Sequence, residues 1–136
     1  MKHLPVSAAI IVRTNPQTQK KELFATQRGY GDFKGGWEFP GGKLEPSETP
    51  EECIVREIRE ELATEVKADK IIGVVEYDYP DFHLSMDCFY ATVKKGELVL
   101  KEAKSAKWLS ADELDSVNWL PADMEVVEII RKKMNE

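Results

Sequence analysis

Apolar runs separated by polar turns predict that the chain begins with strands. The segment from Val6 to Arg13 reads VSAAIIVR, and a second apolar run extends from Glu22 to Arg28. The polar sequence TNPQTQK between them is typical of a turn, so the two segments are expected to form a hairpin. Further along, RGYGDFKGG predicts a glycine-rich loop, WEF a short strand, and PGGKLEPSE a second loop.

A helix with one apolar and one acidic face is predicted after Thr49. Thr49 is a candidate N-cap, Pro50 suits the first helical position, and Glu52 completes a Thr-x-x-Glu capping box. At about 100° per residue, the side expected to face the core holds Ile54, Val55, Ile58 and Leu62. The opposite side holds Glu57, Glu60 and Glu61, with Cys53 at its edge.

The second half of the chain predicts strands followed by a helix. Strands are expected at about Lys70–Tyr77 and Phe82–Val93, and a short one near Lys107–Leu109. Ser110 and Glu113 predict a capped helical turn, and Pro121 opens a last helix that reaches about Met134. The apolar stripe of that helix comprises Val126, Val127, Ile130 and Met134. This order of elements favours an α/β fold with a mixed sheet between helices, in one domain spanning residues 1–136.

Composition narrows the classes of function. The formal net charge of −6 argues against non-specific nucleic-acid binding, which needs a basic surface. The apolar start is too short for a membrane span and lacks a signal-peptide cleavage pattern, so no membrane partner is expected. Cys53 and Cys88 form neither a disulfide framework nor a zinc-ligand set, which favours a reducing, cytoplasmic location. His3 and His83 are too isolated to predict a metal or catalytic set.

The acidic face of the first helix has two interpretations. A glutamate-rich stripe is most often a solvated surface, on which Arg56 and Arg59 form ordinary ion pairs. However, like charges about 4 Å apart repel by roughly 4 kcal/mol at an effective dielectric near 20, so acids held in a cleft favour a divalent cation. Mg²⁺, or Mn²⁺, suits carboxylate oxygens, and Gly41 and Gly42 just upstream allow backbone carbonyls to approach such an ion.

The segment GKLEPSETPEECIVREIREELAT, from Gly42, resembles the Nudix box. That pattern is Gly, five residues, Glu, seven residues, and then Arg-Glu-apolar-x-Glu-Glu-x-Gly-apolar. The matching positions are Gly42, Glu48, Arg56, Glu57, Ile58, Glu60 and Glu61. Ala63 and Thr64 depart from the final Gly and apolar positions. Because the glycine position is the helix exit, where a left-handed residue is common, Ala is expected to cost about 1 kcal/mol relative to Gly.

Beyond the box, WEFPGGK, Lys101-Glu102 with Trp108, and Leu120 to Asp123 resemble the MutT-type branch of the Nudix family. The resemblance implies an α/β/α sandwich and Mg²⁺-dependent hydrolysis of a nucleoside triphosphate to a monophosphate and pyrophosphate. The implied substrates are (d)CTP or modified nucleotides such as 8-oxo-dGTP, and the implied role is cleaning of the nucleotide pool. Alternatives are hydrolysis of another nucleoside diphosphate derivative, such as ADP-ribose or a dinucleotide, and a non-catalytic nucleotide-sensing module. Either a monomer or a homodimer is compatible.

The same resemblance implies roles for individual residues. The implied metal ligands are the carboxylates of Glu57, Glu60, Glu61 and Glu102 and the carbonyl of Gly41. Glu57 is the first choice for the base that takes a proton from the attacking water, with Glu102 and Glu60 as alternatives. A Glu48–Arg56 pair, together with Gly42, is expected to fix the loop against the helix and orient these acids.

Arg28, Lys43, Phe39 and Asp123 are candidates for substrate binding, with Trp37 as an alternative to Phe39. Arg28 and Lys43 are expected near the phosphates or the nucleotide, although either can be a solvated side chain. Phe39 or Trp37 can stack on a base, or WEF can be core. The resemblance to the MutT-type branch implies that Asp123 is at the position that reads the base edge; the alternative is a first-turn helix acid. Ionised, it favours an amino group of cytosine or adenine; protonated, it can also donate, so that oxidised guanine becomes readable.

Overall fold

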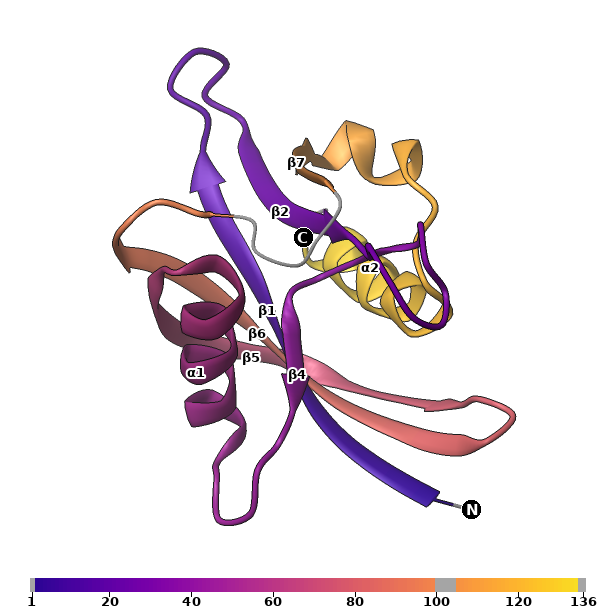
Figure 1. Cartoon of the computed structure of the whole chain (residues 1–136). Coiled ribbons are helices and arrows are strands. Elements are labelled where there is room, and N and C mark those ends of the chain that lie inside the picture. The colour runs from indigo at the N-terminus through magenta and orange to yellow at the C-terminus, as the bar shows by residue number, and fades with distance from the viewer. Residues whose placement is uncertain (1, 100–104, 135–136) are drawn as a thin grey trace.

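The computed structural model describes residues 2–99 and 105–134. Figure 1 shows strands in the middle and helices at the sides. In chain order the elements are β1 (Lys2–Thr14), β2 (Lys21–Gln27), β3 (Trp37–Glu38), β4 (Gly41–Lys43), α1 (Pro50–Leu62), β5 (Glu65–Asp78), β6 (Phe82–Lys95), β7 (Ser105–Ser110), the 3₁₀ helix η1 (Ala111–Ser116) and α2 (Pro121–Met134). None of the helices in the described residues is both long and apolar enough to cross a membrane.

The sheet is mixed, as the order of elements predicts. Its main strand order is β3-β2-β1-β6-β5, with β4 added to β1 and β7 added to β2. β1 and β6 run parallel, whereas the other named pairs are antiparallel. β1 is long enough to join two parts of the sheet, because its first ten residues pair with β6 while Val12 to Thr14 pair with β2.

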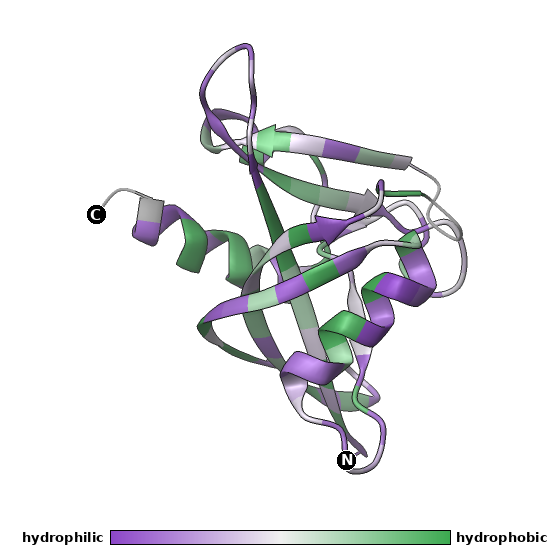
Figure 2. Cartoon of the chain, turned by 90° about the vertical axis from the view of Figure 1, so that its left-hand side faces the viewer, coloured by the Kyte–Doolittle hydropathy of each residue, from purple (hydrophilic) through white to green (hydrophobic). Residues whose placement is uncertain are grey.

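Apolar side chains of β1 alternate between two cores on opposite faces of the sheet. Ala8 and Ile10 pack with residues of α2, including Val126 and Ile130. Ala9 and Ile11 belong to a second cluster, together with Ile54, Ile58 and Leu62 of α1. The helices therefore cover opposite faces (Figure 1), and Figure 2 shows apolar and polar stretches alternating along both. This is the α/β/α sandwich expected from the sequence.

Helix α1 begins as predicted, with one change to its buried face. The Thr49 hydroxyl accepts a hydrogen bond from the Glu52 amide at 3.1 Å, and the Glu52 side chain accepts one from the Thr49 amide at 2.9 Å. Cys53 is fully buried, whereas Val55, which was expected in the core, is half-buried. The helix turns its apolar face slightly towards β4, because the Cys53 thiol lies 3.4 Å from the Gly42 carbonyl.

Both departures from the Nudix pattern are accommodated at the exit of α1. Ala63 adopts the left-handed conformation (φ 53°, ψ 38°), and its amide donates to the Arg59 carbonyl. Thr64 is buried, and its hydroxyl lies 2.8 Å from the Leu62 carbonyl and 2.6 Å from the Glu97 carbonyl. The polar side chain therefore has acceptors within the fold, which offsets the cost of burying it in an apolar position.

Three predicted boundaries are wrong. β1 begins at Lys2, four residues before the expected start at Val6. The expected loop PGGKLEPSE contains β4, in which Gly41 pairs with Ala8 and Lys43 with Val6. Sequence patterns miss this strand because two of its three residues are glycines. β5 begins at Glu65, five residues before the expected start, and its register shifts twice between Ala68 and Gly73. These irregularities interrupt the period-two pattern from which strands are recognised.

Candidate active site

Two adjoining cavities form the cleft of the molecule, with volumes of about 420 Å³ and about 500 Å³. Both are lined by Arg28, Tyr30, Glu38, Phe39, Gly41 and Lys43. The first cavity also reaches Glu61 of α1, and the second reaches Gly42 and Asp123. The fold thus brings the acidic helix, the glycine-rich strand β4 and the start of α2 to one cleft.

Arg56 is the centre of an ion-pair network on α1. Its Nε and Nη2 donate to the two carboxylate oxygens of Glu48 at 2.7 and 3.0 Å, which is a bidentate pair. Its Nη1 lies 2.9 Å from Glu57 and 3.2 Å from Glu60, and Nη2 also donates to the Lys43 carbonyl at 3.0 Å. The expected Glu48–Arg56 pair is therefore present, and it connects β4 to the helix.

The Arg56 guanidinium is a single positive charge among several carboxylates. Glu45 adds a fourth acid at 3.6 Å from Nη1, so one positive group faces four negative ones. The hydrogen bonds from Arg56 lower the pKa of Glu48 to about 2, and the same bonds raise the pKa of Arg56. Arg59 does not join the network, because it pairs with Glu65 on the surface. The local excess of negative charge favours binding of an additional cation.

The two glycines of β4 permit close contacts that other residues would prevent. A Cβ atom at Gly42 would lie 2.4 to 2.7 Å from the carboxylate atoms of Glu57. A Cβ atom at Gly41 would lie 2.0 Å from the carbonyl oxygen of Ser7 in β1. Gly41 therefore lets β4 pair tightly with β1, and Gly42 leaves the space that the Glu57 carboxylate fills.

The predicted metal ligands fit a hard divalent cation in their chemistry. Glu57, Glu60 and Glu61 supply carboxylate oxygens from one helix, beside a glycine strand with approachable carbonyls. The Glu57 side chain is 16% exposed and that of Glu60 is 59% exposed, so protein surrounds the former, whereas the latter pairs with Arg56 and has space in solvent to turn towards an ion. In the described residues, no three carboxylate oxygens from these glutamates come within 4.8 Å of one another. Binding of one ion by all three carboxylates therefore requires side-chain rotation.

Cys53 lies beside the acids but is a packing residue. Its thiol is buried and faces the Gly42 and Lys43 carbonyls at 3.4 and 3.5 Å. Burial, and next the charge of Glu48, raises the pKa of this thiol to about 12. It is protonated at neutral pH, which disfavours a role as a nucleophile.

The candidate phosphate and base contacts line the cleft. Arg28 donates to both carboxylate oxygens of Glu38, at 3.1 and 2.7 Å, and to the Asp32 carbonyl at 3.0 Å. These bonds use three of its five N–H groups. Lys43 is exposed at the edge of both cavities. Phe39 is buried and stacks on Trp119 with ring centroids 4.7 Å apart, so one face of its ring is occupied by protein.

Asp123 is a buried acid at the inner end of the larger cavity. It is 6% exposed, and its Oδ1 accepts a hydrogen bond from the Phe39 amide at 2.9 Å. Burial, the largest effect, raises the pKa of this carboxyl to about 8. Asp123 is therefore mostly protonated at neutral pH, and it can donate one hydrogen bond as well as accept.

The family model described as "NUDIX domain" matches residues 3–129. The chain belongs to the Nudix family. It is 37% identical over 102 residues to an "8-oxo-dGTP diphosphatase" of Proteus vulgaris, covering 74% of this chain and 87% of that protein. It is 31% identical over 128 residues to a "CTP pyrophosphohydrolase" of Escherichia coli (strain K12), covering 94% and 91%. The solution structure of the E. coli ORF135 protein is similar, with a TM-score of 0.82, 28% identity and coverage of 98% and 92%.

Nudix hydrolases act on nucleotides and generally use a divalent metal ion, and the protein belongs to this class of enzyme. Of the predicted site residues, Glu102 lies outside the described residues. Sequence analysis missed Glu38, which pairs with Arg28 inside the cleft. The sequence signal for this pair is that WEF follows the second predicted strand after a glycine-rich loop, so that the two strands can pair as a hairpin. In the structure Glu38 is opposite Thr26, two residues before Arg28.

Proposed function

We propose that this Nudix hydrolase is a Mg²⁺-dependent nucleoside triphosphate pyrophosphohydrolase that releases a nucleoside monophosphate and pyrophosphate. The proposed substrates are oxidised deoxynucleotides such as 8-oxo-dGTP, or (d)CTP, in the free nucleotide pool of the cytoplasm. The names of relatives that align with most of the chain support this class of reaction. The observation that carries the proposal is that Glu61 of the acidic helix α1, the glycine strand β4 and the buried Asp123 line one cleft.

Electrostatics explains why the reaction would need a metal ion. A triphosphate carries about four negative charges, and the chain has a formal net charge of −6, so the two repel unless cations lie between them. Glu57, Glu60 and Glu61 would hold Mg²⁺ with the carbonyl of Gly41, and Glu102 is a further candidate. When bound, the ion would neutralise phosphate charge and polarise the phosphorus centre.

The proton of the attacking water needs a carboxylate acceptor on the protein. The water oxygen forms a bond to the phosphorus on one side of the α–β phosphoanhydride bond, this bond breaks, and the nucleoside monophosphate and pyrophosphate are released. Glu57 is the first choice as base, because Gly42 and Arg56 hold its carboxylate at one position. Glu60, which is more exposed, and Glu102 are the alternatives.

Asp123 and Phe39 would read the base. Because Oδ1 of Asp123 accepts the Phe39 amide, the proton of the neutral carboxyl can be offered by Oδ2 to a base carbonyl. A donor and an acceptor side by side suit oxidised guanine, which presents the O6 carbonyl next to a protonated N7, and also suit cytosine, which presents N3 next to its amino group. Arg28 and Lys43, at the wall shared by the two cavities, are the proposed cationic contacts for nucleotide and phosphate.

The proposal is tested by a screen of natural and oxidised nucleoside triphosphates with Mg²⁺, in which pyrophosphate and phosphate are measured separately. We expect pyrophosphate from 8-oxo-dGTP or a cytosine nucleotide. Glu57→Gln should reduce turnover by at least about 100-fold, whereas Glu125→Gln, an exposed residue of α2, should leave it unchanged. Release of phosphate alone, hydrolysis of only ADP-ribose or dinucleotides, or full activity of Glu57→Gln would refute it.

A further inference from the structure

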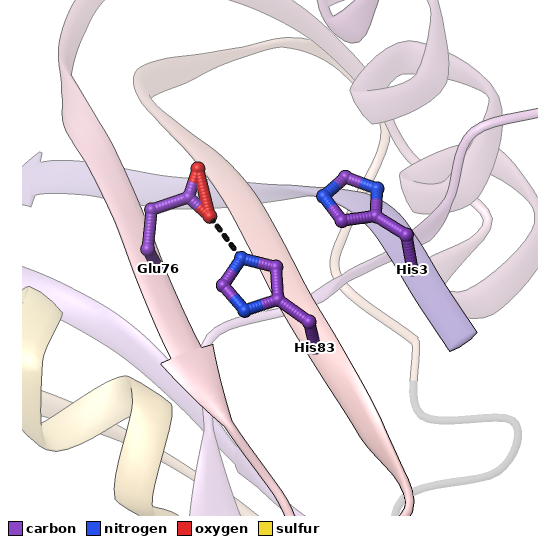
Figure 3. Close-up of side chains that lie close together, drawn as sticks. All are labelled: His3, Glu76 and His83. Atoms are coloured by element: carbon purple, nitrogen blue, oxygen red, sulfur yellow. Dashed lines mark hydrogen bonds and ion pairs between the residues drawn. The ribbon is translucent and has the colours of Figure 1, made fainter. Parts of the chain in front are cut away.

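A second group of candidate metal ligands lies on the sheet, and none of its members belongs to the acidic helix α1. His3 of β1, Glu76 of β5 and His83 of β6 place one ligand atom each within 4.8 Å of one another (Figure 3). The imidazole rings of His3 and His83 stack with centroids 5.1 Å apart. The sequence interpretation of these histidines as isolated is therefore wrong, because strand pairing brings together residues that are 80 positions apart.

Strand register fixes this arrangement. His3 is directly opposite His83 in the parallel pair of β1 and β6. His83 is opposite Asp78 in the antiparallel pair of β6 and β5, and Glu76 lies two residues from Asp78 on the same face of β5. Paired side chains on neighbouring strands point to the same face, so three strands each contribute a ligand to one spot.

Hydrogen bonds around the group hold two of the three ligands in position. The Nδ1 atom of His83 is 2.6 Å from an Asp78 carboxylate oxygen, while its Nε2 atom faces Oε2 of Glu76 at 2.7 Å. The hydroxyl of Ser85 donates to the other Glu76 oxygen at 2.9 Å. A histidine that donates one ring N–H to a carboxylate and directs the other nitrogen towards an ion is the usual arrangement of a metal-binding histidine.

We propose that His3, Glu76 and His83 bind a transition-metal ion of the zinc class, through two imidazole nitrogens and one carboxylate oxygen. Ligands of a tetrahedral Zn²⁺ lie about 2.0 to 2.2 Å from the ion and thus about 3.4 Å from one another. The three atoms are already within 4.8 Å, and His3 and Glu76 are exposed side chains that can rotate. Imidazole selects zinc-class metals over Mg²⁺, so this site and the carboxylate set of α1 differ in metal preference.

The proposed ion would connect three strands behind the cleft. Residues that alternate with the ligands along β1 and β6, namely Leu4, Leu84 and Met86, line the larger cavity on the opposite face. An ion held by β1, β5 and β6 would resist separation of the strands that carry these cavity residues. The competing explanation is a metal-free imidazolium, because Asp78 first, and then Glu76, raises the pKa of His83.

The chain contains two histidines, and both belong to the proposed site. Histidine side-chain NMR of the tag-free wild-type protein therefore reports the site directly. Titration with Zn²⁺ in the presence of excess Mg²⁺ should shift or broaden the imidazole signals of both residues together and saturate at one ion per chain. Signals that do not respond, or a response of His3 alone, would overturn the proposal.

Calorimetric titration with Zn²⁺ provides a second test. A Glu57→Gln, Glu60→Gln protein serves as background, so that zinc binding to the α1 acids is weakened, and circular dichroism checks that every variant is folded. In that background His3→Gln, His83→Gln and Glu76→Gln should each weaken binding at least about tenfold. Glu125→Gln is the matched glutamate control and should bind as the background does. Equal affinity across the four variants would contradict the assignment.

Discussion

The carboxylate of Glu57 lies so close to the Cα atom of Gly42 that a Cβ atom there would be 2.4 to 2.7 Å from it. Gly42→Ala should therefore displace Glu57, while the surrounding strand keeps its pairing to β1. If Glu57 is the base or a metal ligand, a displacement of about 1 Å is expected to lower kcat by about 100-fold. Steady-state kinetics with the substrate found in the screen measures this effect.

Gly73→Ala is the matched control for this substitution. Gly73 lies in β5, and a Cβ atom there would be 3.6 Å from the Ile129 side chain, an ordinary van der Waals distance. This variant should retain its kcat and its thermal midpoint. Normal turnover by folded Gly42→Ala would show that the position of Glu57 is not important for the chemistry.

The bidentate pair of Glu48 and Arg56 predicts an acid-dependent contribution to stability. The pKa of Glu48 is about 2 in the folded protein and about 4.3 in the unfolded chain. The ionised carboxylate therefore stabilises the folded state fully above about pH 4.3, and this contribution is lost as the pH falls towards 2. Glu48→Gln should thus be less stable than wild type at pH 7, and the difference should shrink between about pH 4.5 and pH 2. Urea unfolding over this range measures it, and a constant difference would argue against the ionised pair.

The agreement between sequence and structure is best where local chemistry decides the outcome. Helix α1 is specified by residues that are close together in the sequence. These are the capping box of Thr49 and Glu52 and the apolar spacing of Ile54, Ile58 and Leu62. The Glu48–Arg56 pair could also be expected, because Glu48 lies just before the helix that carries Arg56 and the family pattern fixes their spacing.

The features that sequence analysis missed depend on contacts between distant segments. The strand β4 exists because β1 lies beside it, and the cluster of His3 with His83 exists because β1 and β6 are in register. The sequence does not decide whether the Asp123 carboxyl is protonated, because its raised pKa results from burial, which depends on the folded cavity and not on the neighbouring residues. Such properties become accessible once the strand order is known.

The left-handed conformation of Ala63 predicts a stabilising substitution. A residue with a Cβ atom costs about 1 kcal/mol more than glycine at such a position, so Ala63→Gly should raise the free energy of unfolding by about that amount. Ala111→Gly is the control, because Ala111 is exposed in η1 and is not among the residues with positive φ. It should be neutral or destabilising. Destabilisation by Ala63→Gly would contradict the described helix exit.

Asp123 predicts that stability decreases as the pH rises. Its carboxyl has a pKa of about 8 in the folded protein and about 3.9 in the unfolded chain, so the folded state retains a proton that the unfolded state has lost. The stabilisation is complete below about pH 4 and is lost towards pH 8, by at most about 1.4 kcal/mol per pH unit. Asn has no proton to lose, so Asp123→Asn should become progressively more stable than wild type over this range. A difference that does not vary with pH in urea unfolding would exclude a protonated Asp123.

The same ionisation predicts that base preference depends on pH. Below pH 8 the Asp123 carboxyl can donate to the carbonyl of oxidised guanine, whereas the carboxylate above pH 8 can only accept, which favours the amino group of cytosine. The ratio of kcat/KM for 8-oxo-dGTP to that for dCTP should therefore fall about tenfold between pH 7 and pH 9, and the ratio cancels pH effects on the shared chemical step. In Asp123→Asn, where an amide both donates and accepts at every pH, the ratio should stay constant. An equal change in both proteins would mean that another group reads the base.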